Sequence, residues 1–405
     1  RRDVAAQGWN VLREDLPLPL AVLKQSKLLH NAQWMQNFLT SSGVVIAPHG
    51  KTTMSPQLFK LQMECGAWGM TVATVQQLRV CRRFGINRVL MANQLLGKQA
   101  IRYVLNELQH DPKFQFFAIV DSIENIAALV KEARELNINR PLNLLIELGV
   151  KGKRTGCRSV ASALEVAHAL SRAYPLLALA GVECFEGLLV TDDPEQDAAK
   201  VSTLLTHTME LARRCEEEQL FNTDKIIISA GGSAYFDIVS RQLAKEHLKS
   251  PHEIVLRSGC YLTHDAAFYD RLFTLLANRL GQQPAAGRLE PALEVWAYVQ
   301  SCPEADLAIL NLGKRDCSYD IDLPVPTLWF NAATHQQPQR LDNAYQIFKL
   351  DDQHAYMRVP ASAKIQVGDL IACGISHPCT TFDKWRELFV VDDEYNVVNM
   401  IKTYF

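Results

Sequence analysis

The sequence lacks several features that would place it in a specialised class of protein. Its 42 basic and 44 acidic side chains give a formal net charge of −2, which offers no general attraction to a phosphate backbone. No stretch approaches the roughly 20 apolar residues that are needed to span a bilayer. Residues 1–8 contain no apolar segment of the kind found in signal peptides. We therefore expect no nucleic-acid partner, no membrane span and a cytoplasmic location.

The ten cysteines have no short repeating spacing, and no internal repeat or low-complexity tract is present. In a long chain without an export signal, such cysteines are expected to be reduced thiols that are mostly buried. The amino-acid composition is that of an ordinary globular protein, with 48% hydrophobic and 21% charged residues. A chain of 405 residues suits one large domain together with a smaller one.

Short apolar runs alternate with longer segments of helical spacing in the first two thirds of the chain. Nearly continuous apolar runs are typical of parallel strands that are buried on both faces. The eight runs are residues 44–48, 70–73, 88–93, 114–121, 142–148, 180–185, 225–229 and 254–256. Helical spacing appears between them, for example at 123–136, 159–174 and 194–218, and an amphipathic helix is expected at 21–39. Eight βα units favour the α/β class and a closed (β/α)8 barrel (TIM barrel) over an open sheet.

The pattern changes near Gly281, where residues 281–287 have the composition of a linker. Short β patterns follow, separated by turns rich in Gly, Pro and Asp. They are residues 293–299, 307–310, 355–359, 369–373 and 389–391. We therefore predict a barrel domain over 19–281 and a second, smaller, mostly β domain over 282–405. Residues 1–18 are a candidate addition to the second domain.

The first candidate motif is Ala-Pro-His-Gly-Lys-Thr at 47–52, at the end of the first predicted strand. In βα barrels the carboxyl ends of the strands line the active site. In extended backbone His49 and Lys51, two residues apart, would point the same way. A lysine beside another cation or among apolar groups can act as an amine nucleophile and form a Schiff base. A solvated loop lysine is the alternative interpretation.

Two turns after the seventh and eighth predicted strands are candidates for phosphate binding. In Ser-Ala-Gly-Gly-Ser at 229–233, adjacent glycines let backbone N–H groups approach an anion. Ser233 is predicted to be a helix N-cap and a phosphate donor. Arg-Ser-Gly-Cys-Tyr at 257–261 follows the eighth strand, and phosphates in these barrels often bind near the last two βα loops. A plain strand-to-helix turn is the alternative for each segment.

The predicted β domain contains the pair His377-Pro-Cys379, whose imidazole and thiolate are good zinc ligands. In extended chain this spacing would place both side chains on one face. Two protein ligands would leave positions open for water or substrate, as a catalytic metal requires. Chance occurrence of so short a pair is the alternative. Arg154, after the fifth strand, could bind a carboxylate or a phenolic oxygen, or belong to a solvated loop.

Taken together, these motifs resemble those of the D-serine dehydratase and D-threonine aldolase superfamily, pyridoxal-phosphate enzymes with the alanine racemase-type fold (fold type III). The resemblance extends from about residue 21 to the C-terminus. The matching segments are 48–52, 69–73, 154–156, 229–233 and 257–261, then His354 and 377–379. One departure is Ala47, where many members carry arginine before Pro-His. The contacts to a substrate carboxylate are therefore left open.

The resemblance implies that pyridoxal 5'-phosphate is held through a Schiff base on Lys51. It implies catalytic roles for Lys51, His377 and Cys379, and a divalent metal, zinc, on the last two. Phosphate contacts are implied from 231–233 and 259–261, and Arg257 is a candidate for the pyridine nitrogen. The implied cofactor-binding residues are His49, Lys51, Arg154, Ser229, Gly231, Gly232, Ser233, Arg257, Gly259, Cys260 and Tyr261.

The resemblance also bears on the reaction. Members that cleave a carbon–carbon bond tend to carry His-x-Asp at the metal site, whereas members that eliminate water tend to carry His-x-Cys, as here. We therefore expect a lyase, a D-serine dehydratase (deaminase), that converts D-serine or a related D-3-hydroxyamino acid to a 2-oxo acid and ammonia. The alternatives are a D-threonine or D-3-hydroxyaspartate aldolase, a racemase, a D-threo-3-hydroxyaspartate dehydratase and a non-catalytic pyridoxal-phosphate carrier. Analogy with the family predicts a homodimer.

Overall fold

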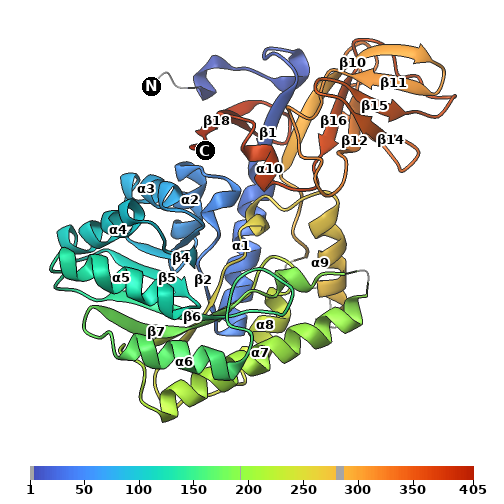
Figure 1. Cartoon of the computed structure of the whole chain (residues 1–405). Coiled ribbons are helices and arrows are strands. Elements are labelled where there is room, and N and C mark those ends of the chain that lie inside the picture. The colour runs from blue at the N-terminus through green and yellow to red at the C-terminus, as the bar shows by residue number, and fades with distance from the viewer. Residues whose placement is uncertain (1–3, 192, 280–286) are drawn as a thin grey trace. The chain divides into compact units, whose positions relative to one another are not determined.

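The computed structural model describes residues 4–191, 193–279 and 287–405. The chain forms two compact units (Figure 1). The barrel unit contains Gln36–Lys51 and Gln62–Gly259, and the β unit contains the described residues of Arg1–Met35, Thr52–Leu61 and Cys260–Phe405. The predicted linker and the predicted boundary at 281 lie outside the described residues, apart from Gly287.

The barrel unit is built on an eight-stranded parallel sheet of described residues, in the order β2-β9-β8-β7-β6-β5-β4-β3. The strands are β2 (Val45–Ile46), β3 (Met70–Val72), β4 (Arg88–Gln94), β5 (Gln115–Val120), β6 (Leu142–Leu148), β7 (Leu177–Cys184), β8 (Ile226–Ser229) and β9 (His252–Leu256). The two end strands are joined as well, because Thr71 N donates to the Pro48 carbonyl at 2.9 Å and His49 forms a parallel bridge with Thr71. The predicted strands and the (β/α)8 barrel are confirmed.

The interior of the barrel is apolar because each strand contributes side chains to a shared core. Leu90, Ile119, Leu145, Ile227 and Val255 come from five different strands and pack together, all of them buried. Such continuous apolar strands are the pattern from which the parallel sheet was predicted. The polar loops that follow the strands are then left to carry the chemistry.

Helices lie around the outside of these strands (Figure 1). They are α3 (Val75–Arg83), α4 (Lys98–His110), α5 (Ile123–Glu135), α6 (Val160–Ser171), α7 (Pro194–Glu217) and α8 (Phe236–Leu243), while α1 (Gln25–Ser42) and α2 (Pro56–Glu64) lie earlier in the chain. Ser122, Ser159 and Asp193 cap α5, α6 and α7 by accepting a hydrogen bond from a backbone N–H of the first turn. The helices predicted at 123–136, 159–174 and 194–218 are therefore confirmed, with ends shifted by up to three residues.

The second unit consists mostly of β-strands, as predicted, and most of its strand pairs are antiparallel. Its strands run in the order β13-β12-β16-β10-β1-β17-β18, and β11, β15 and β14 extend from β10. They are β1 (Leu20–Lys24), β10 (Leu293–Glu304), β11 (Leu307–Leu310), β12 (Val325–Phe330), β13 (Gln339–Arg340), β14 (Gln346–Leu350), β15 (Ala355–Arg358), β16 (Leu370–Gly374), β17 (Glu387–Val391) and β18 (Val397–Lys402). Two further helices are α9 (Phe268–Arg279) and α10 (Cys379–Phe382). Among the described residues, no helix is both long and apolar enough to cross a membrane.

The prediction of a single helix over 21–39 is wrong at its start. Leu20–Lys24 forms β1, which pairs antiparallel with β10 and parallel with β17. Every residue of β1 is buried, and four of its five residues are apolar, which is typical of a strand that is covered on both faces of its sheet. The helical pattern therefore begins only at Gln25, the first residue of α1.

Candidate functional site

The segment after β2 places His49 inside the barrel unit. His49 is half-buried, and its Nδ1 atom is buried without a hydrogen-bond partner among the described residues. Burial lowers its pKa well below the usual value, and the positive charges of Lys51, Arg257 and Arg154 lower it further. A low pKa favours the neutral imidazole, and an anionic ligand would balance the positive charges near it.

The backbone at Lys51 differs from the prediction. Gly50–Thr52 forms a 3-10 turn, so the extended conformation expected from 49 to 51 ends at His49. Extended pairing stops here because the turn carries the chain away from β3 toward α2. Lys51 is exposed, which leaves its amine accessible to a ligand.

Arg257 follows β9 and is already paired within the barrel unit. Its guanidinium forms a buried ion pair with Glu183 and donates to the Cys184 carbonyl at 2.8 Å. Burial alone would lower the pKa of Arg257, but the charge and hydrogen bond of Glu183 outweigh this effect and raise it. The Arg257 and Arg154 guanidinium carbons lie 6.0 and 4.7 Å from the centre of the Phe185 ring. One aromatic ring therefore contacts both arginines.

The glycine turn after β8 binds a carboxylate. Gly231 N and Gly232 N donate to the two carboxylate oxygens of Glu186 at 3.1 and 2.6 Å. Gly231 has φ +90°, and a Cβ atom there would lie 2.5 Å from a methyl group of Leu256. Two adjacent N–H groups that converge on one anion are the geometry of a phosphate-binding turn. Glu186 was not selected from the sequence, where an acid in Cys-Phe-Glu-Gly carries no particular signal.

The other residues predicted to bind phosphate do not join this turn in a single anion-binding site. Ser229 donates its hydroxyl to the Val255 carbonyl at 3.1 Å, so this hydroxyl supports the sheet. The prediction that Ser233 caps the next helix is wrong, because a turn intervenes and α8 begins at Phe236 with Tyr235 at the N-cap position. Gly259 is the last residue of the barrel unit, and Cys260 and Tyr261 begin a buried 3-10 turn of the β unit.

The β unit brings His377 and Cys379 into a polar cluster. The predicted extended backbone is wrong here, because Pro378 has helical angles and Cys379 is the first residue of α10. His377 Nδ1 lies 2.7 Å from a carboxylate oxygen of Asp320. Cys379 Sγ lies 3.3 Å from the Thr52 hydroxyl and 3.8 Å from Cys260 Sγ. Asp320 was not selected from the sequence, and Thr52 was included only as the last residue of the lysine motif at 47–52.

The electrostatics of this cluster favour a thiolate. A hydrogen bond from Cys260 is the largest of the effects that hold the Cys379 pKa well below its usual value, and His377 adds to it. Burial lowers the pKa of His377, but Cys379 and Asp320 outweigh this and raise it to about 9. Thiolate and imidazole are zinc-ligand chemistry. In the described part of the chain, however, no three His, Cys, Asp or Glu side chains are grouped so that they could hold a metal ion.

His354, which the resemblance selected, lies apart in the turn between β14 and β15. It is exposed, and its carbonyl accepts a hydrogen bond from Asp351 N at 2.9 Å. The contact that holds His354 in this turn is therefore made by its backbone carbonyl.

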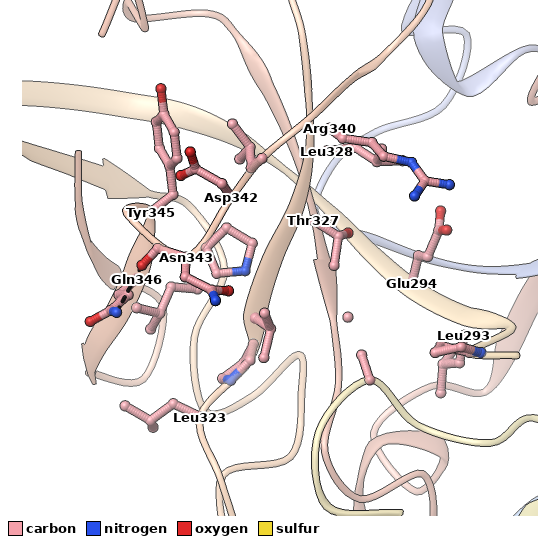
Figure 2. Close-up of a pocket in the computed structure, with 18 of the residues that line it drawn as sticks. Leu293, Glu294, Leu323, Thr327, Leu328, Arg340, Asp342, Asn343, Tyr345 and Gln346 are labelled. Carbon is pink, nitrogen blue, oxygen red and sulfur yellow. Dashed lines mark hydrogen bonds between the residues drawn. The ribbon is translucent and has the colours of Figure 1, made fainter. Parts of the chain in front are cut away.

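A groove of about 710 Å³ lies elsewhere in the β unit (Figure 2). Glu294 and Arg340 lie on one side of it, and Asp342 and Tyr345 on the other. Lys27 is paired with Glu294 at 3.6 Å. None of the residues selected from the sequence lines this groove. We therefore place the candidate site in the turns described above.

Comparisons with known proteins agree with the fold. Residues 23–242 match the family described as "Alanine racemase, N-terminal domain", and residues 292–391 match "Putative serine dehydratase domain". A 3-hydroxy-D-aspartate aldolase of Paracoccus denitrificans (strain Pd 1222) is 25% identical over 314 residues, 76% of this chain and 75% of that protein. A D-threonine aldolase of Arthrobacter sp is 23% identical over 382 residues, 93% of this chain and 89% of that protein.

Among solved structures, D-threo-3-hydroxyaspartate dehydratase from Delftia sp. HT23 superimposes with a TM-score of 0.74 at 20% identity, covering 98% of this chain and 99% of that one. Two variants of a dehydratase of this name also have solved structures. In one, alanine replaces a histidine. In the other, alanine replaces a cysteine two positions after that histidine, and the structure is of the metal-free form. Because the alanine racemase match alone covers more than half of the sequence, the chain belongs to the alanine racemase N-terminal domain family, within the fold type III superfamily of pyridoxal-phosphate enzymes.

Proposed function

We propose that this protein is a pyridoxal-phosphate- and metal-dependent lyase that converts D-serine or a related D-3-hydroxyamino acid to a 2-oxo acid and ammonia. Elimination of water comes first, and hydrolysis of the product then takes up one water and releases ammonia. The observation that carries the proposal is the setting of Thr52. Its hydroxyl lies 3.3 Å from the sulfur of Cys379, and it is the residue directly after Lys51 in the sequence. Thr52 and Cys379 both belong to the β unit. The match of residues 292–391 to "Putative serine dehydratase domain" supports assigning the thiolate of this unit and the lysine of the barrel unit to one reaction.

The barrel unit fits the cofactor chemically. Glu186 is a stand-in anion on the N–H groups of Gly231 and Gly232, which shows that this turn accepts a negatively charged oxygen pair. The buried Nδ1 atom of His49 lacks a partner among the described residues, and Lys51 presents an exposed amine. When bound, pyridoxal phosphate acts as an electron sink for a carbanion at the amino-acid Cα.

Lys51 would hold the cofactor and serve as the general base that takes the proton from the substrate Cα. Arg154 and Arg257 supply positive charge on the same unit, and Glu183 keeps Arg257 in place through a buried ion pair. The neutral His49 can donate or accept a hydrogen bond without adding a charge to the site.

His377 and Cys379 would hold a divalent cation, and zinc suits a nitrogen and thiolate donor set. Such an ion supplies Lewis acidity toward a hydroxyl oxygen. Asp320 orients His377 through Nδ1, and the Thr52 hydroxyl contacts the sulfur of Cys379. The spacing of this pair matches the histidine and cysteine replaced in the dehydratase structures. This match favours elimination over carbon–carbon cleavage.

A product assay tests the proposal. Purified protein is incubated separately with D-serine, D-threonine and D-threo-3-hydroxyaspartate, and the products are identified by mass spectrometry. Elimination gives a 2-oxo acid and ammonia, and chelation of the metal should abolish it. Full activity of metal-free protein would remove the metal from the reaction.

An aldolase is the second candidate, because both curated relatives described above are aldolases acting on D-3-hydroxyamino acids by name. The same assay separates the two, since an aldolase yields glycine and an aldehyde. Formation of the L-isomer would instead indicate a racemase. A protein that binds the cofactor and converts none of the three substrates would support a carrier.

A further inference from the structure

Arg154 carries a positive charge for which the described residues supply no ion-pair partner. Its guanidinium lies on the Phe185 ring, whereas Arg257, the other arginine at this ring, is already paired with Glu183. Burial lowers the pKa of His49, and the charge of Arg154 adds to this effect. The guanidinium is therefore near enough to act on the candidate site of the barrel unit, although Arg154 is exposed. An arginine in this setting is available to pair with an anionic ligand.

The loop that carries Arg154 is fastened to the end of β6. Gly149 N donates to the Cys157 carbonyl, and Cys157 N donates to the Glu147 carbonyl, both at 2.8 Å. The Thr155 hydroxyl donates to the Glu147 carboxylate, also at 2.8 Å. These three hydrogen bonds fix the backbone directly after Arg154 to the strand that precedes it.

Arg158 holds the same loop through an exposed side chain. Its guanidinium donates to the carbonyls of Lys153, Arg154 and Thr155, at 3.0, 2.5 and 2.7 Å. A guanidinium carries five N–H donors in a planar, fixed fork, so one side chain can span three consecutive carbonyls. The peptide that bears Arg154 is therefore held directly by a second arginine.

Gly149 leaves the space that this arrangement requires. A Cβ atom at this position would overlap both the Thr155 carbonyl oxygen and a guanidinium nitrogen of Arg158. Gly156 has φ +98°, and a Cβ atom there would lie 2.5 Å from the backbone nitrogen of Gly149. A side chain at either glycine would displace the loop, because the loop, its strand and Arg158 are packed closely together.

We propose that Arg158 is a positioning residue for Arg154, which keeps the Arg154 guanidinium beside Phe185 where it can pair with an anionic oxygen of a bound ligand. This inference rests on the proposed function, whose cofactor and substrate both carry anionic oxygens. A group that is held in place before the ligand binds costs less ordering entropy on binding. A displacement of about 1 Å at such a group can cost about 10²-fold. The loss of Arg158 should therefore be measurable at the ligand.

Arg158→Ala tests the proposal through two separate measurements. Equilibrium dialysis gives the dissociation constant of pyridoxal 5'-phosphate, and initial rates with D-serine at saturating cofactor give KM and kcat. We expect one of these two ligands to bind about 10- to 100-fold more weakly. If the cofactor affinity falls, Arg154 pairs with an oxygen of the cofactor. If only KM rises while kcat is retained, Arg154 pairs with the substrate carboxylate. Arg158→Lys retains the charge but lacks the planar fork, so it should recover only part of the loss.

A double-mutant cycle shows whether Arg158 acts through Arg154. Arg154→Ala should weaken binding of the same ligand, and adding Arg158→Ala to it should cause little further loss, because the group to be positioned is already gone. Additive losses would overturn the proposal, since Arg158 would then act by another route. Arg172→Ala removes an exposed arginine at the end of α6 and is the matched control, which should behave like the wild type.

The outcomes separate this inference from the proposed function. If Arg158→Ala retains the wild-type cofactor affinity, KM and kcat, the positioning role is wrong, while elimination by the wild-type protein would leave the lyase assignment intact. A lower unfolding temperature together with unchanged ligand binding would assign Arg158 to stability alone and would also overturn its positioning role. If the wild-type protein binds no pyridoxal phosphate, both proposals are wrong.

Discussion

His377 Nδ1 and a carboxylate oxygen of Asp320 lie 2.7 Å apart, although 57 residues separate them in the sequence. The contact fixes the plane of the imidazole and selects which ring nitrogen remains free. It therefore controls the only histidine of the proposed metal site without placing Asp320 among the ligands.

Asp320→Ala should therefore lower metal affinity by about 10- to 100-fold, the cost of losing an outer carboxylate. Competition with a chromogenic chelator measures the change. Asp352→Ala is the matched control, because Asp352 is an exposed aspartate of the β unit. Equal metal affinity in both variants would show that Asp320 does not support His377 as a ligand.

Lys51→Ala should remove the visible absorbance of the bound cofactor and lower turnover by at least about 10²-fold, the contribution of a positioned general base. Lys245→Ala, an exposed lysine of the barrel unit, should retain both. The readouts are the absorbance spectrum after gel filtration and the rate of 2-oxo acid formation. A yellow, active Lys51→Ala protein would assign the cofactor to another residue.

Glu186→Ala should tighten binding of pyridoxal phosphate, because the Glu186 carboxylate occupies the N–H groups of Gly231 and Gly232. Removing a charged competitor for two hydrogen bonds is worth about tenfold or more in affinity. Equilibrium dialysis measures the affinity, and pyridoxal, which lacks the phosphate, should bind both proteins alike.

Inorganic phosphate gives an independent readout of the same turn. Glu186→Ala leaves two buried N–H groups unpaired, so phosphate should raise its unfolding temperature more than that of wild type. Glu165→Ala, an exposed acid on α6, serves as the control. Weaker binding of pyridoxal phosphate by Glu186→Ala would mean that Glu186 helps to build the turn instead of competing for it.

The barrel could be predicted because its strands are specified locally. The runs at 142–148 and 254–256 are apolar at nearly every position, and this is sufficient for a strand buried on both faces. Residues 21–24 are also mostly apolar, but the sequence predicts a helix over 21–39 because the apolar residues after them recur at helical spacing. The two partner strands of these residues lie hundreds of residues away, and only their pairing distinguishes strand from helix there.

Candidate residues could be selected from the sequence where a motif is contiguous, but not where a contact joins distant parts of the chain. Lys51 and the glycine turn at 231–232 were selected from neighbouring residues alone. Glu186 reaches that turn across 45 residues, and Asp320 reaches His377 across 57, so no local pattern reveals either contact. Cys260 was selected for its backbone in a phosphate turn, and its sulfur acquires a different setting through Cys379.

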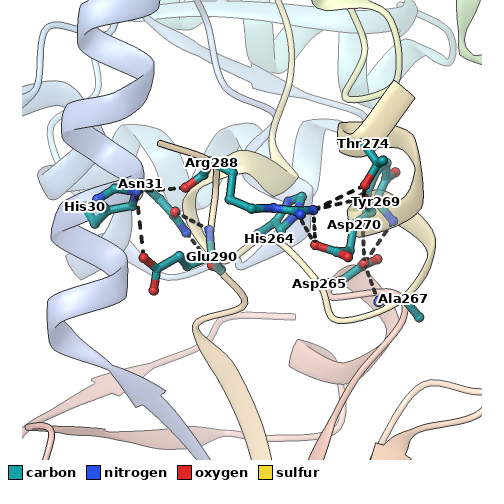
Figure 3. A network of polar contacts seen from close by, with 10 residues as sticks. All are labelled: His30, Asn31, His264, Asp265, Ala267, Tyr269, Asp270, Thr274, Arg288 and Glu290. Carbon is teal, nitrogen blue, oxygen red and sulfur yellow. Dashed lines mark hydrogen bonds and ion pairs between the residues drawn. The ribbon is translucent and has the colours of Figure 1, made fainter. Parts of the chain in front are cut away.

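Asp265 begins a polar network at the N-terminus of α9 (Figure 3). Its Oδ1 atom accepts hydrogen bonds from the backbone N–H groups of Ala267, Tyr269 and Asp270 at 3.0, 2.8 and 3.3 Å. Its Oδ2 atom is buried without a partner among the described residues. Burial raises the pKa of Asp265 to about 7, above the usual value of 3.8.

The stability of the protein should therefore fall as pH rises through this window. Between pH 3.8 and about 7 the folded state binds one more proton at Asp265 than the unfolded state does, so the stabilisation is present below this range and is lost as pH approaches 7. The resulting change in the free energy of unfolding is at most about 4 kcal/mol. Asp265→Asn keeps the acceptor for the three N–H groups but cannot ionise. Between pH 3.8 and about 7, the unfolding temperature of Asp265→Asn should therefore fall less than that of the wild-type protein. Asp306→Asn changes an exposed aspartate and should behave like the wild type. Parallel curves for all three proteins would show that the Asp265 carboxyl titrates as it does in the unfolded chain.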